Sequence, residues 1–412
     1  MKIAVLGGGV SGLTAAFRLG ADGHEVTVFE ASDRLGGNIS TDEWNECLVE
    51  WGPNGFLDNE PATLRLIEDL GLTDRLIRAR ESAERRYIWR EGKLRELPTK
   101  PAKFLFSDCL SLFGRLRVLK EPWTKPAPAG DESLHDFATR HMGREAAEIL
   151  IDAFVTGVYA GDPKRLSVAS AFPKLKKLED EYGSLIRGAK GRGFGPKGVL
   201  TSFDRGLQVL IDALGERVDV RFNAPVDQID KGEFDHVICT LPARKLAPLV
   251  DGELAGLLNE IPIAPVTVVA LKFRDPIDVP DAFGFLVPRN QGLRILGTLY
   301  DSSIFVNRAP DGSRLFRVLI GGRRDPEAVT LSDDELREIV SRELRQVWGS
   351  FSEPSEFGVV RHPLGISQYE IGHAKRLERI QAAAPEWLRL AGSSYRGVAL
   401  NACVKEALDW TP

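Results

Sequence analysis

Six glycine-rich residues near the start of the chain have the types and spacing of a nucleotide-binding turn. Gly7-Gly8-Gly9-Val10-Ser11-Gly12 fits the pattern G-x-G-x-x-G and directly follows the apolar run 3–6. The first glycine of such a turn permits a tight bend, the second lets a pyrophosphate approach the backbone, and the third lets helix and strand pack closely. The free N–H groups at the helix start then hold the phosphates. Glu30, 18 residues after Gly12, is placed to accept a hydrogen bond from a ribose hydroxyl.

The first motif occurs in both NAD-binding and FAD-binding proteins. Three further segments favour FAD. Arg34-Leu35-Gly36-Gly37 completes the pattern E-x-x-x-R-x-G-G, in which a cation and two glycines meet an extended pyrophosphate and a ribityl chain. Gly52-Pro53-Asn54-Gly55 provides a second close backbone approach. Gly397-Val398-Ala399-Leu400-Asn401 lies between a predicted strand and a predicted helix. A helix N-terminus there would face the flavin edge where negative charge builds up on reduction. The alternative for 397–401 is an ordinary strand-to-helix turn.

The elements that position these motifs follow from hydrophobic periodicity. Residues 1–40 are typical of a strand, a glycine turn, a helix ending near Gly23 and a second strand. Further strands are predicted at 218–222, 237–240, 266–273, 283–287, 293–300, 315–320 and 388–391. The four between 266 and 320 lack intervening helices, which indicates an antiparallel sheet. Ser332 and Glu335 form a capping box at the start of a helix over 332–348, and a last helix is predicted near 401–410.

The middle of the chain is predicted to be a helical insert over residues 90–205. Apolar positions over 102–120 form one broad helical stripe, and residues 133–186 are also typical of helices. The insert contains two basic stretches, since 90–125 has nine Lys/Arg against four Asp/Glu and 174–205 has eight against four. They are either solvated helix faces or a basic surface toward an anionic ligand or membrane. The 104–119 stripe either lies on an anionic membrane or covers a substrate tunnel.

Composition excludes several classes of protein. A chain of 412 residues with 43% hydrophobic and 27% charged residues is typical of a globular enzyme of two or three domains, and its net charge of −5 argues against nucleic acid as a partner. We expect no membrane-spanning helix and no signal peptide, because no apolar run is long enough to span a bilayer and the first residues form a buried strand. We also expect no metal site, because the six histidines and four scattered cysteines form no ligand pair. A reduced, cytoplasmic setting is therefore expected.

These motifs together resemble the protoporphyrinogen/coproporphyrinogen oxidase family, within the FAD-dependent, amine-oxidase-like flavoproteins. The resemblance covers nearly the whole chain. Its first two motifs are common to many flavoproteins, whereas 157–163, 300–305 and 368–373 are more specific to porphyrinogen oxidases. The matching stretches are 7–12, 30–37, 50–56, 157–163, 203–207, 283–288, 300–305, 368–373 and 391–403.

The resemblance implies residues for the cofactor and for the substrate. FAD would be bound by Gly7, Gly8, Gly9, Val10, Ser11, Gly12, Glu30, Ala31, Arg34, Gly36, Gly37, Gly52, Pro53, Asn54, Gly55, Val226, Val398, Ala399 and Leu400. The substrate would lie near Asn54, Gly157, Phe283 and Leu286, with Lys100 and Lys103 as hypothetical carboxylate partners. Without the resemblance, Phe283 is interpreted as a core aromatic on a strand.

The implied reaction is oxidation of protoporphyrinogen IX or coproporphyrinogen III to the porphyrin in haem biosynthesis, by hydride transfer to flavin N5 with O2 as electron acceptor. No side-chain base is obligatory, because a pyrrole N–H releases the proton. The alternatives are an amine or carotenoid oxidase or desaturase of the same group, and a non-catalytic flavin- or porphyrin-binding protein. Departures from the family pattern are Asn38, Ser367 and Ala402; the last puts one polar contact near the flavin in doubt.

The predicted fold is α/β and α+β: a Rossmann-like FAD-binding domain, an antiparallel-sheet substrate domain and the helical insert. The FAD-binding domain would comprise 1–60, 206–242 and 386–412, and the substrate domain 61–89 and 243–385. A peripheral contact with the inner face of the cell membrane, a homodimer and transient contacts with other haem-pathway enzymes are further hypotheses.

Overall fold

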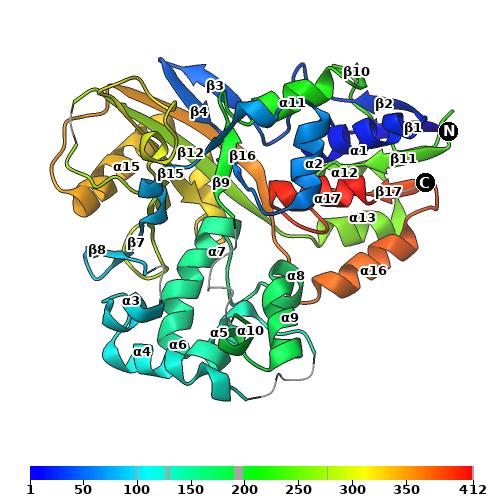
Figure 1. Ribbon diagram of the computed structural model, residues 1–412. Helices are drawn as coiled ribbons and strands as arrows, with labels where there is room; N and C mark the ends of the chain where they lie inside the picture. Colours follow the sequence, from blue (N-terminus) through cyan, green and yellow to red (C-terminus); the bar gives the residue numbers. More distant parts are fainter. Residues whose placement is uncertain (99–100, 126, 128–129, 190–197, 276, 411–412) are drawn as a thin grey trace.

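The computed structural model describes residues 1–98, 101–125, 127, 130–189, 198–275 and 277–410 (Figure 1). A five-stranded parallel sheet carries the first glycine turn, in the order β10-β2-β1-β11-β17. Its strands are β1 (Lys2–Leu6), β2 (Glu25–Phe29), β10 (Asp219–Arg221), β11 (His236–Cys239) and β17 (Leu388–Leu390). The strands predicted in these regions are confirmed.

Helices cover both faces of this sheet, as a parallel sheet requires. On β1, Ile3 and Val5 pack into one apolar cluster, while Ala4 and Leu6 pack into another on the opposite face. The first cluster is completed by α1 (Val10–Ala21), α2 (Pro61–Asp69), α11 (Gln208–Gly215) and α17 (Leu400–Leu408). The second contains α12 (Ala243–Leu246), α13 (Gly252–Asn259) and α16 (His373–Ala383). Both chain ends lie on this side of the molecule (Figure 1).

A seven-stranded sheet forms the other large layer, in the order β16-β12-β15-β14-β13-β7-β8. Its strands are β7 (Arg86–Arg90), β8 (Lys93–Glu96), β12 (Ile263–Phe273), β13 (Gly284–Leu286), β14 (Ile295–Leu299), β15 (Arg314–Gly321) and β16 (Glu356–Ser367). The predicted strands between 266 and 320 are therefore present. The sheet is not wholly antiparallel as predicted, because β7, from the segment before the insert, pairs parallel with β13.

The helix α15 (Asp333–Trp348) packs on this sheet through Val340 and Leu344. Its predicted capping box is confirmed: Ser332 Oγ accepts from the Glu335 backbone N–H, and the Glu335 carboxylate accepts from the Ser332 backbone N–H. Two small sheets link the layers. One pairs β3 (Thr41–Trp44) with β4 (Cys47–Glu50), and the other joins β5 (Phe56–Leu57), β9 (Leu200–Phe203) and β6 (Leu76–Arg78). Short 3-10 turns lie at Thr73–Arg75, Glu81–Glu84, Ala247–Leu249, Gly322–Arg324 and Pro326–Thr330.

The described elements between β8 and β9 are helical and gather at one end of the molecule (Figure 1), whereas these two strands lie inside the bounds 90–205 of the predicted helical insert. Its elements are α3 (Pro101–Phe106), α4 (Leu112–Leu119), the 3-10 turn η3 (Glu121–Trp123), α5 (Leu134–Met142), α6 (Arg144–Ala146), the π-helical η4 (Ala147–Ile151), α7 (Asp152–Tyr159), α8 (Val168–Ala171), α9 (Pro173–Tyr182) and α10 (Leu185–Ala189). None of the helices in the described ranges is long and apolar enough to cross a bilayer.

The single stripe predicted over 102–120 is wrong, because the chain breaks between α3 and α4. Cys109 and Leu110 turn inward at the break and are buried. Asp108 pairs with Arg95 at 2.7 Å. Ser111 then caps α4, its Oγ accepting from the backbone N–H three residues on at 3.0 Å. These capping and pairing contacts stop the helix where apolar periodicity alone predicts that it continues.

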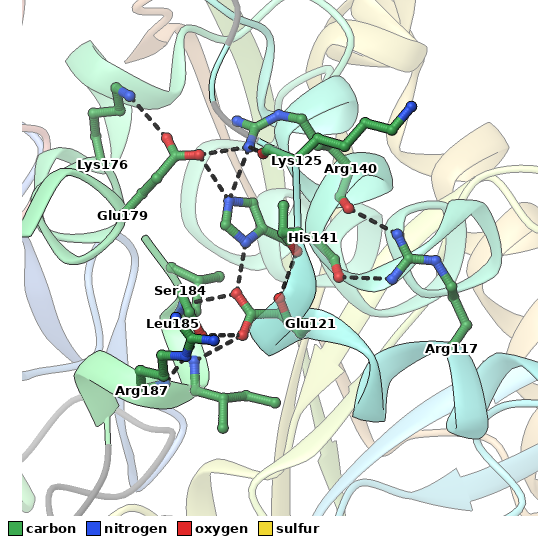
Figure 2. Close-up of polar contacts among 12 residues, drawn as sticks. Arg117, Glu121, Lys125, Arg140, His141, Lys176, Glu179, Ser184, Leu185 and Arg187 are labelled. Atoms are coloured by element: carbon green, nitrogen blue, oxygen red, sulfur yellow. Dashed lines mark hydrogen bonds and ion pairs between the residues drawn. The ribbon is translucent and has the colours of Figure 1, made fainter. Parts of the chain in front are cut away.

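A buried polar cluster holds the insert helices together (Figure 2). His141 is 0% exposed; its Nδ1 lies 2.6 Å from Glu121 Oε1 and its Nε2 lies 3.0 Å from Glu179 Oε1. Glu121 also accepts from Ser184 Oγ at 2.6 Å and from the next two backbone N–H groups. Burial by itself raises the pKa of Glu121, but the hydrogen bonds from His141 and Ser184 outweigh it and lower the pKa to about 2.

Candidate cofactor and substrate site

The first glycine turn has the close packing that its spacing predicts. Gly7 has φ +105°, a conformation that L side chains rarely adopt. A Cβ on Gly12 would stand 2.1 Å from the Gly7 carbonyl oxygen, so helix and strand can approach only with glycine at this position. The Leu13 N–H donates to the Gly9 carbonyl at 3.0 Å and opens α1. The N–H groups ahead of that bond are those that a phosphate uses at a helix start.

The acidic residue and the second glycine pair lie against this turn. Glu30 lies at the end of β2, where its Oε2 accepts from the Gly8 N–H at 2.8 Å and its Oε1 accepts from Ser32. Gly36 donates through its N–H to the Gly8 carbonyl at 2.8 Å. Arg34 is exposed and its guanidinium donates to backbone carbonyls of its own loop. Ala31, next to Glu30, is exposed, and Val226 packs partly buried in the cluster on the opposite face of the sheet.

The turn near the C-terminus meets the turn near the N-terminus. Helix α17 packs against α1, and a Cβ on Gly392 would lie 3.5 Å from Ser11 Oγ. Gly397, with φ +135°, donates its N–H to the Tyr369 hydroxyl at 2.6 Å, and that hydroxyl donates to the Ser393 carbonyl at 2.7 Å. Tyr369 therefore holds the turn that leads to Val398–Leu400 at the start of α17.

The predicted cofactor segments fit FAD, as two observations indicate. The glycines let these segments pack closely on one another, since a Cβ on Gly52 would lie 1.8 Å from the Asn38 carbonyl oxygen. Two buried polar atoms in these segments also have no partner within the described chain: Asn54 Nδ2 and Asn401 Oδ1. A dinucleotide with hydrogen-bonding groups along its length is the type of ligand that such segments accept.

Asn54 is held from the side by a buried ion pair. Arg317 on β15 donates to Asp301 through Nε at 2.7 Å and through Nη2 at 2.8 Å. The same Nη2 donates to Asn54 Oδ1 at 2.7 Å. Asp301 begins the short helix α14 (Asp301–Ile304). The pair thus links the second sheet to the segment Gly52–Gly55.

The predicted substrate residues come from separate elements. Gly157, on α7, lies against Leu286: a Cβ there would stand 3.1 Å from Leu286 Cδ1. Phe283, just before β13, is partly buried and lies under Arg86, whose guanidinium carbon is 4.7 Å from the ring centroid. Lys103 is exposed on α3, whereas Lys100 lies outside the described residues.

One apolar cluster joins the C-terminal cofactor turn to α7, the helix that carries the predicted substrate residue Gly157. Tyr159, two residues after Gly157, and Tyr369 are both in it, and Val398 from the C-terminal turn packs against it. A cavity of about 500 Å³ lies elsewhere, between the β3–β4 hairpin and α11, and no predicted site residue lines it. The cofactor turn thus packs near the end of α7, two residues from Gly157.

Two titratable side chains near the C-terminal turn are neutral at physiological pH. Burial raises the pKa of the Cys403 thiol to about 11, so this thiol is not an activated nucleophile. Burial likewise lowers the pKa of His373 to about 4, and its Nε2 lies 2.9 Å from the Tyr395 carbonyl oxygen. Both residues therefore act in packing and hydrogen bonding rather than as ionised catalysts.

Sequence reasoning missed the roles of four residues at this site: Arg86, Asp301, Arg317 and Tyr369. A signal existed for Arg317, since a charged residue inside the apolar run of β15 is unusual for a buried strand. For Arg86 there was none, because it is the second of two adjacent arginines and nothing local distinguishes it from Arg85.

Comparisons with known proteins agree with these features. The model of the family described as flavin containing amine oxidoreductase matches residues 10–409. The chain is 34% identical to a chloroplastic protoporphyrinogen oxidase of Nicotiana tabacum, over 98% of this chain and 84% of the relative. It is 28% identical to the coproporphyrinogen III oxidase of Bacillus subtilis strain 168, over 98% and 96%. A crystal structure of a candidate protoporphyrinogen oxidase from Exiguobacterium sp. 255-15 superposes with a TM-score of 0.87 at 25% identity, covering 99% of this chain and 97% of that one.

Proposed function

The chain belongs to the flavin-containing amine oxidoreductases and, within them, to the protoporphyrinogen/coproporphyrinogen oxidases, and we propose that it oxidises a porphyrinogen to the porphyrin in haem biosynthesis. One observation carries this proposal: similarity to porphyrinogen oxidases extends over 98% of the chain, including the insert and the second sheet. FAD is the cofactor of this oxidoreductase.

The residues proposed to hold FAD come from the glycine turns, the end of β2 and the start of α17. The turn Gly7–Gly12 would bind the pyrophosphate, Glu30 the ribose, and the segments 34–37 and 52–55 the extended chain. Leu400, with Val398 and Ala399 at the start of α17, would face the ring system. When bound, FAD supplies a two-electron acceptor that takes a hydride at N5.

The protein's own contribution to the reaction is positioning and exclusion of water. We place the macrocycle beside Gly157, Leu286 and Phe283, because Gly157 is exposed on α7 and the other two are only partly buried at the facing edge of the second sheet. Arg86 would pair with a substrate carboxylate, together with Lys103, which is exposed on α3, and with Lys100. No side chain needs to remove the proton, because a pyrrole N–H of the substrate releases it. Charge reversal of both lysines should raise KM and leave kcat nearly unchanged.

The test is an anaerobic comparison of protoporphyrinogen IX with coproporphyrinogen III, read by porphyrin fluorescence and flavin bleaching. We expect one equivalent of FAD to be reduced by at least one of the two substrates, and readmission of O2 to give three equivalents of peroxide per porphyrin. Flavin that stays oxidised with both would refute the proposal. Flavin bleaching by an amine or a carotenoid alone would favour the alternative oxidases. Flavin that no candidate substrate bleaches would favour a non-catalytic binding protein.

We also propose that the insert contacts an anionic membrane surface. Phe106, Phe113 and Trp123 are 88%, 83% and 77% exposed on α3, α4 and η3, and Lys103 and Lys120 are exposed beside them. Exposed apolar side chains among cations are typical of interfacial helices. The alternative is that this face covers the substrate entrance.

Flotation of the holoprotein with anionic and neutral vesicles tests this contact. Replacing Phe106 and Phe113 by serine should abolish binding to anionic vesicles, whereas Val306→Ser, at an exposed apolar residue outside α3, α4 and η3, should not. Equal flotation of all variants would contradict the proposal. We further propose a homodimer and transient contacts with other haem-pathway enzymes. The division of the chain into three parts is also a proposal.

A further inference from the structure

The buried arginine of β15 has partners that a structural ion pair alone does not require. Arg317 and Asp301 are each 1% exposed and form a two-pronged pair. Burying both charges is costly in free energy, and apolar residues of similar volume often serve stability as well. A specific role of the pair in orienting its neighbours is therefore worth testing.

Every nitrogen of the Arg317 guanidinium has a partner. Nε and Nη2 donate to Asp301, Nη2 also donates to Asn54 Oδ1, and Nη1 donates to the Gly52 carbonyl at 3.2 Å and to the Glu50 carbonyl. One planar group thus fixes the backbone before Asn54 and the Asn54 side chain together. Its rigid fork allows this, and lysine has no such fork.

The pair also decides which end of the Asn54 amide faces away from it. Arginine has donors and no acceptor, so the Asn54 atom that faces Arg317 must be the carbonyl oxygen. The NH2 group must then point elsewhere. Asn54 Nδ2 is buried and has no acceptor among the described residues. A buried donor without a partner costs free energy, so a bound ligand is the expected acceptor.

The chemistry of the two ligands distinguishes between them. The centre of a porphyrinogen presents pyrrole N–H groups, which are donors and do not accept from an amide, and its acceptors are peripheral carboxylates, which we assign to Arg86, Lys100 and Lys103. The flavin ring system presents carbonyl oxygens and unprotonated nitrogens, which are acceptors. Asn54 also lies in the segment 52–55 proposed for FAD. The flavin therefore matches the free donor.

We propose that Arg317, held by Asp301, is a positioning residue that orients the Asn54 amide to donate to an acceptor of the flavin ring and so raises the flavin's reduction potential. The sign follows because negative charge builds up on the ring during reduction, and a donor stabilises it. This inference rests on the FAD cofactor and not on the identity of the substrate. The inference can fail while the chain still oxidises a porphyrinogen, and it can hold if the substrate is another compound.

The test is the midpoint potential of the FAD-loaded protein, measured against reference dyes without any porphyrinogen. Asn54→Asp keeps an oxygen for Arg317 but replaces the donor by an acceptor, so the potential should shift negative. Arg317→Lys keeps the charge but removes the fork, and should shift the potential in the same direction. Arg308→Lys is the matched control, since Arg308 is equally buried and pairs with Glu50 at 3.2 Å without touching Asn54.

A double-mutant cycle tests whether Arg317 acts through Asn54. In an Asn54→Ala background, Arg317→Lys should cause no further shift of the potential. An equal shift in both backgrounds, or an unchanged potential in Asn54→Asp, would overturn the proposal. If Arg317→Lys does not fold, as judged by thermal melting of the apoprotein, Asp301→Asn takes its place in the cycle because it retains the arginine. The Arg308→Lys protein should keep the wild-type potential; a shift as large as that of Arg317→Lys would also overturn the proposal.

Discussion

The substitution Glu121→Gln should destabilise the helical insert in a pH-dependent way. Glutamine keeps the shape of the side chain and removes the charge that faces His141 Nδ1 and three further donors (Figure 2). The pKa of Glu121 is lowered from 4.5 to about 2. That difference corresponds to about 3 kcal/mol in favour of the ionised carboxylate in the folded state. Since Glu179 shares His141 and also has a pKa of about 2, the two contributions are coupled, and about 3 kcal/mol is an upper value.

The sign of the pH dependence follows from the direction of the shift. A carboxyl group whose folded pKa lies below its unfolded pKa stabilises the folded state fully above about pH 4.5 and progressively less toward about pH 2. By pH 3.5, one unit below the unfolded pKa, about 1.4 kcal/mol of the contribution is lost, because the unfolded chain binds the proton first. The difference between wild type and Glu121→Gln should therefore be largest at neutral pH and shrink on acidification.

Amide hydrogen exchange measured by mass spectrometry is the appropriate assay, because it reports local stability of the insert while the rest of the protein stays folded. At pH 7 the amides of α5 and α10 should exchange up to about 100-fold faster in Glu121→Gln, since 1.4 kcal/mol corresponds to a factor of ten. The control is Glu148→Gln, which removes an exposed carboxylate paired with Arg144 in the same insert and should leave protection unchanged. Equal protection of Glu121→Gln and wild type at pH 7, or a difference that grows toward pH 3.5, would refute the reasoning.

Three other substitutions test the cofactor and substrate residues. Gly12→Ala places a methyl group 2.1 Å from the Gly7 carbonyl oxygen, so the purified protein should contain little FAD, as read from its flavin absorbance per chain; a wild-type flavin content would contradict this. Tyr369→Phe removes the hydroxyl that holds the Gly397 turn; FAD should bind roughly 5-fold more weakly, about 1 kcal/mol, in a titration of apoprotein, and unchanged affinity would count against this role. Arg86→Leu should raise KM for a porphyrinogen with kcat nearly constant, because a substrate carboxylate would lose its guanidinium partner; a fall in kcat alone would assign Arg86 another role.

The sequence by itself was sufficient for features that depend on neighbours along the chain. The turn Gly7–Gly12, the strand before it and the helix after it follow from glycine geometry and apolar periodicity within about 20 residues. The capping box of Ser332 and Glu335 is a contact across three residues, and the structure shows it as predicted. The resemblance to porphyrinogen oxidases was carried by the same kind of short motif.

Only the tertiary structure decided the features that join distant segments. Apolar periodicity could not show that the 102–120 stripe breaks, since Asp108 is held by Arg95 from a separate strand. Nor could it pair β7 with β13 across almost 200 residues. Asn54 meets Arg317 from 263 residues away, and the side of its amide that remains free depends on that contact alone. Short-range hydrogen bonds and periodicity depend on the local sequence, whereas the partner of a buried charge depends on how whole sheets and helices pack.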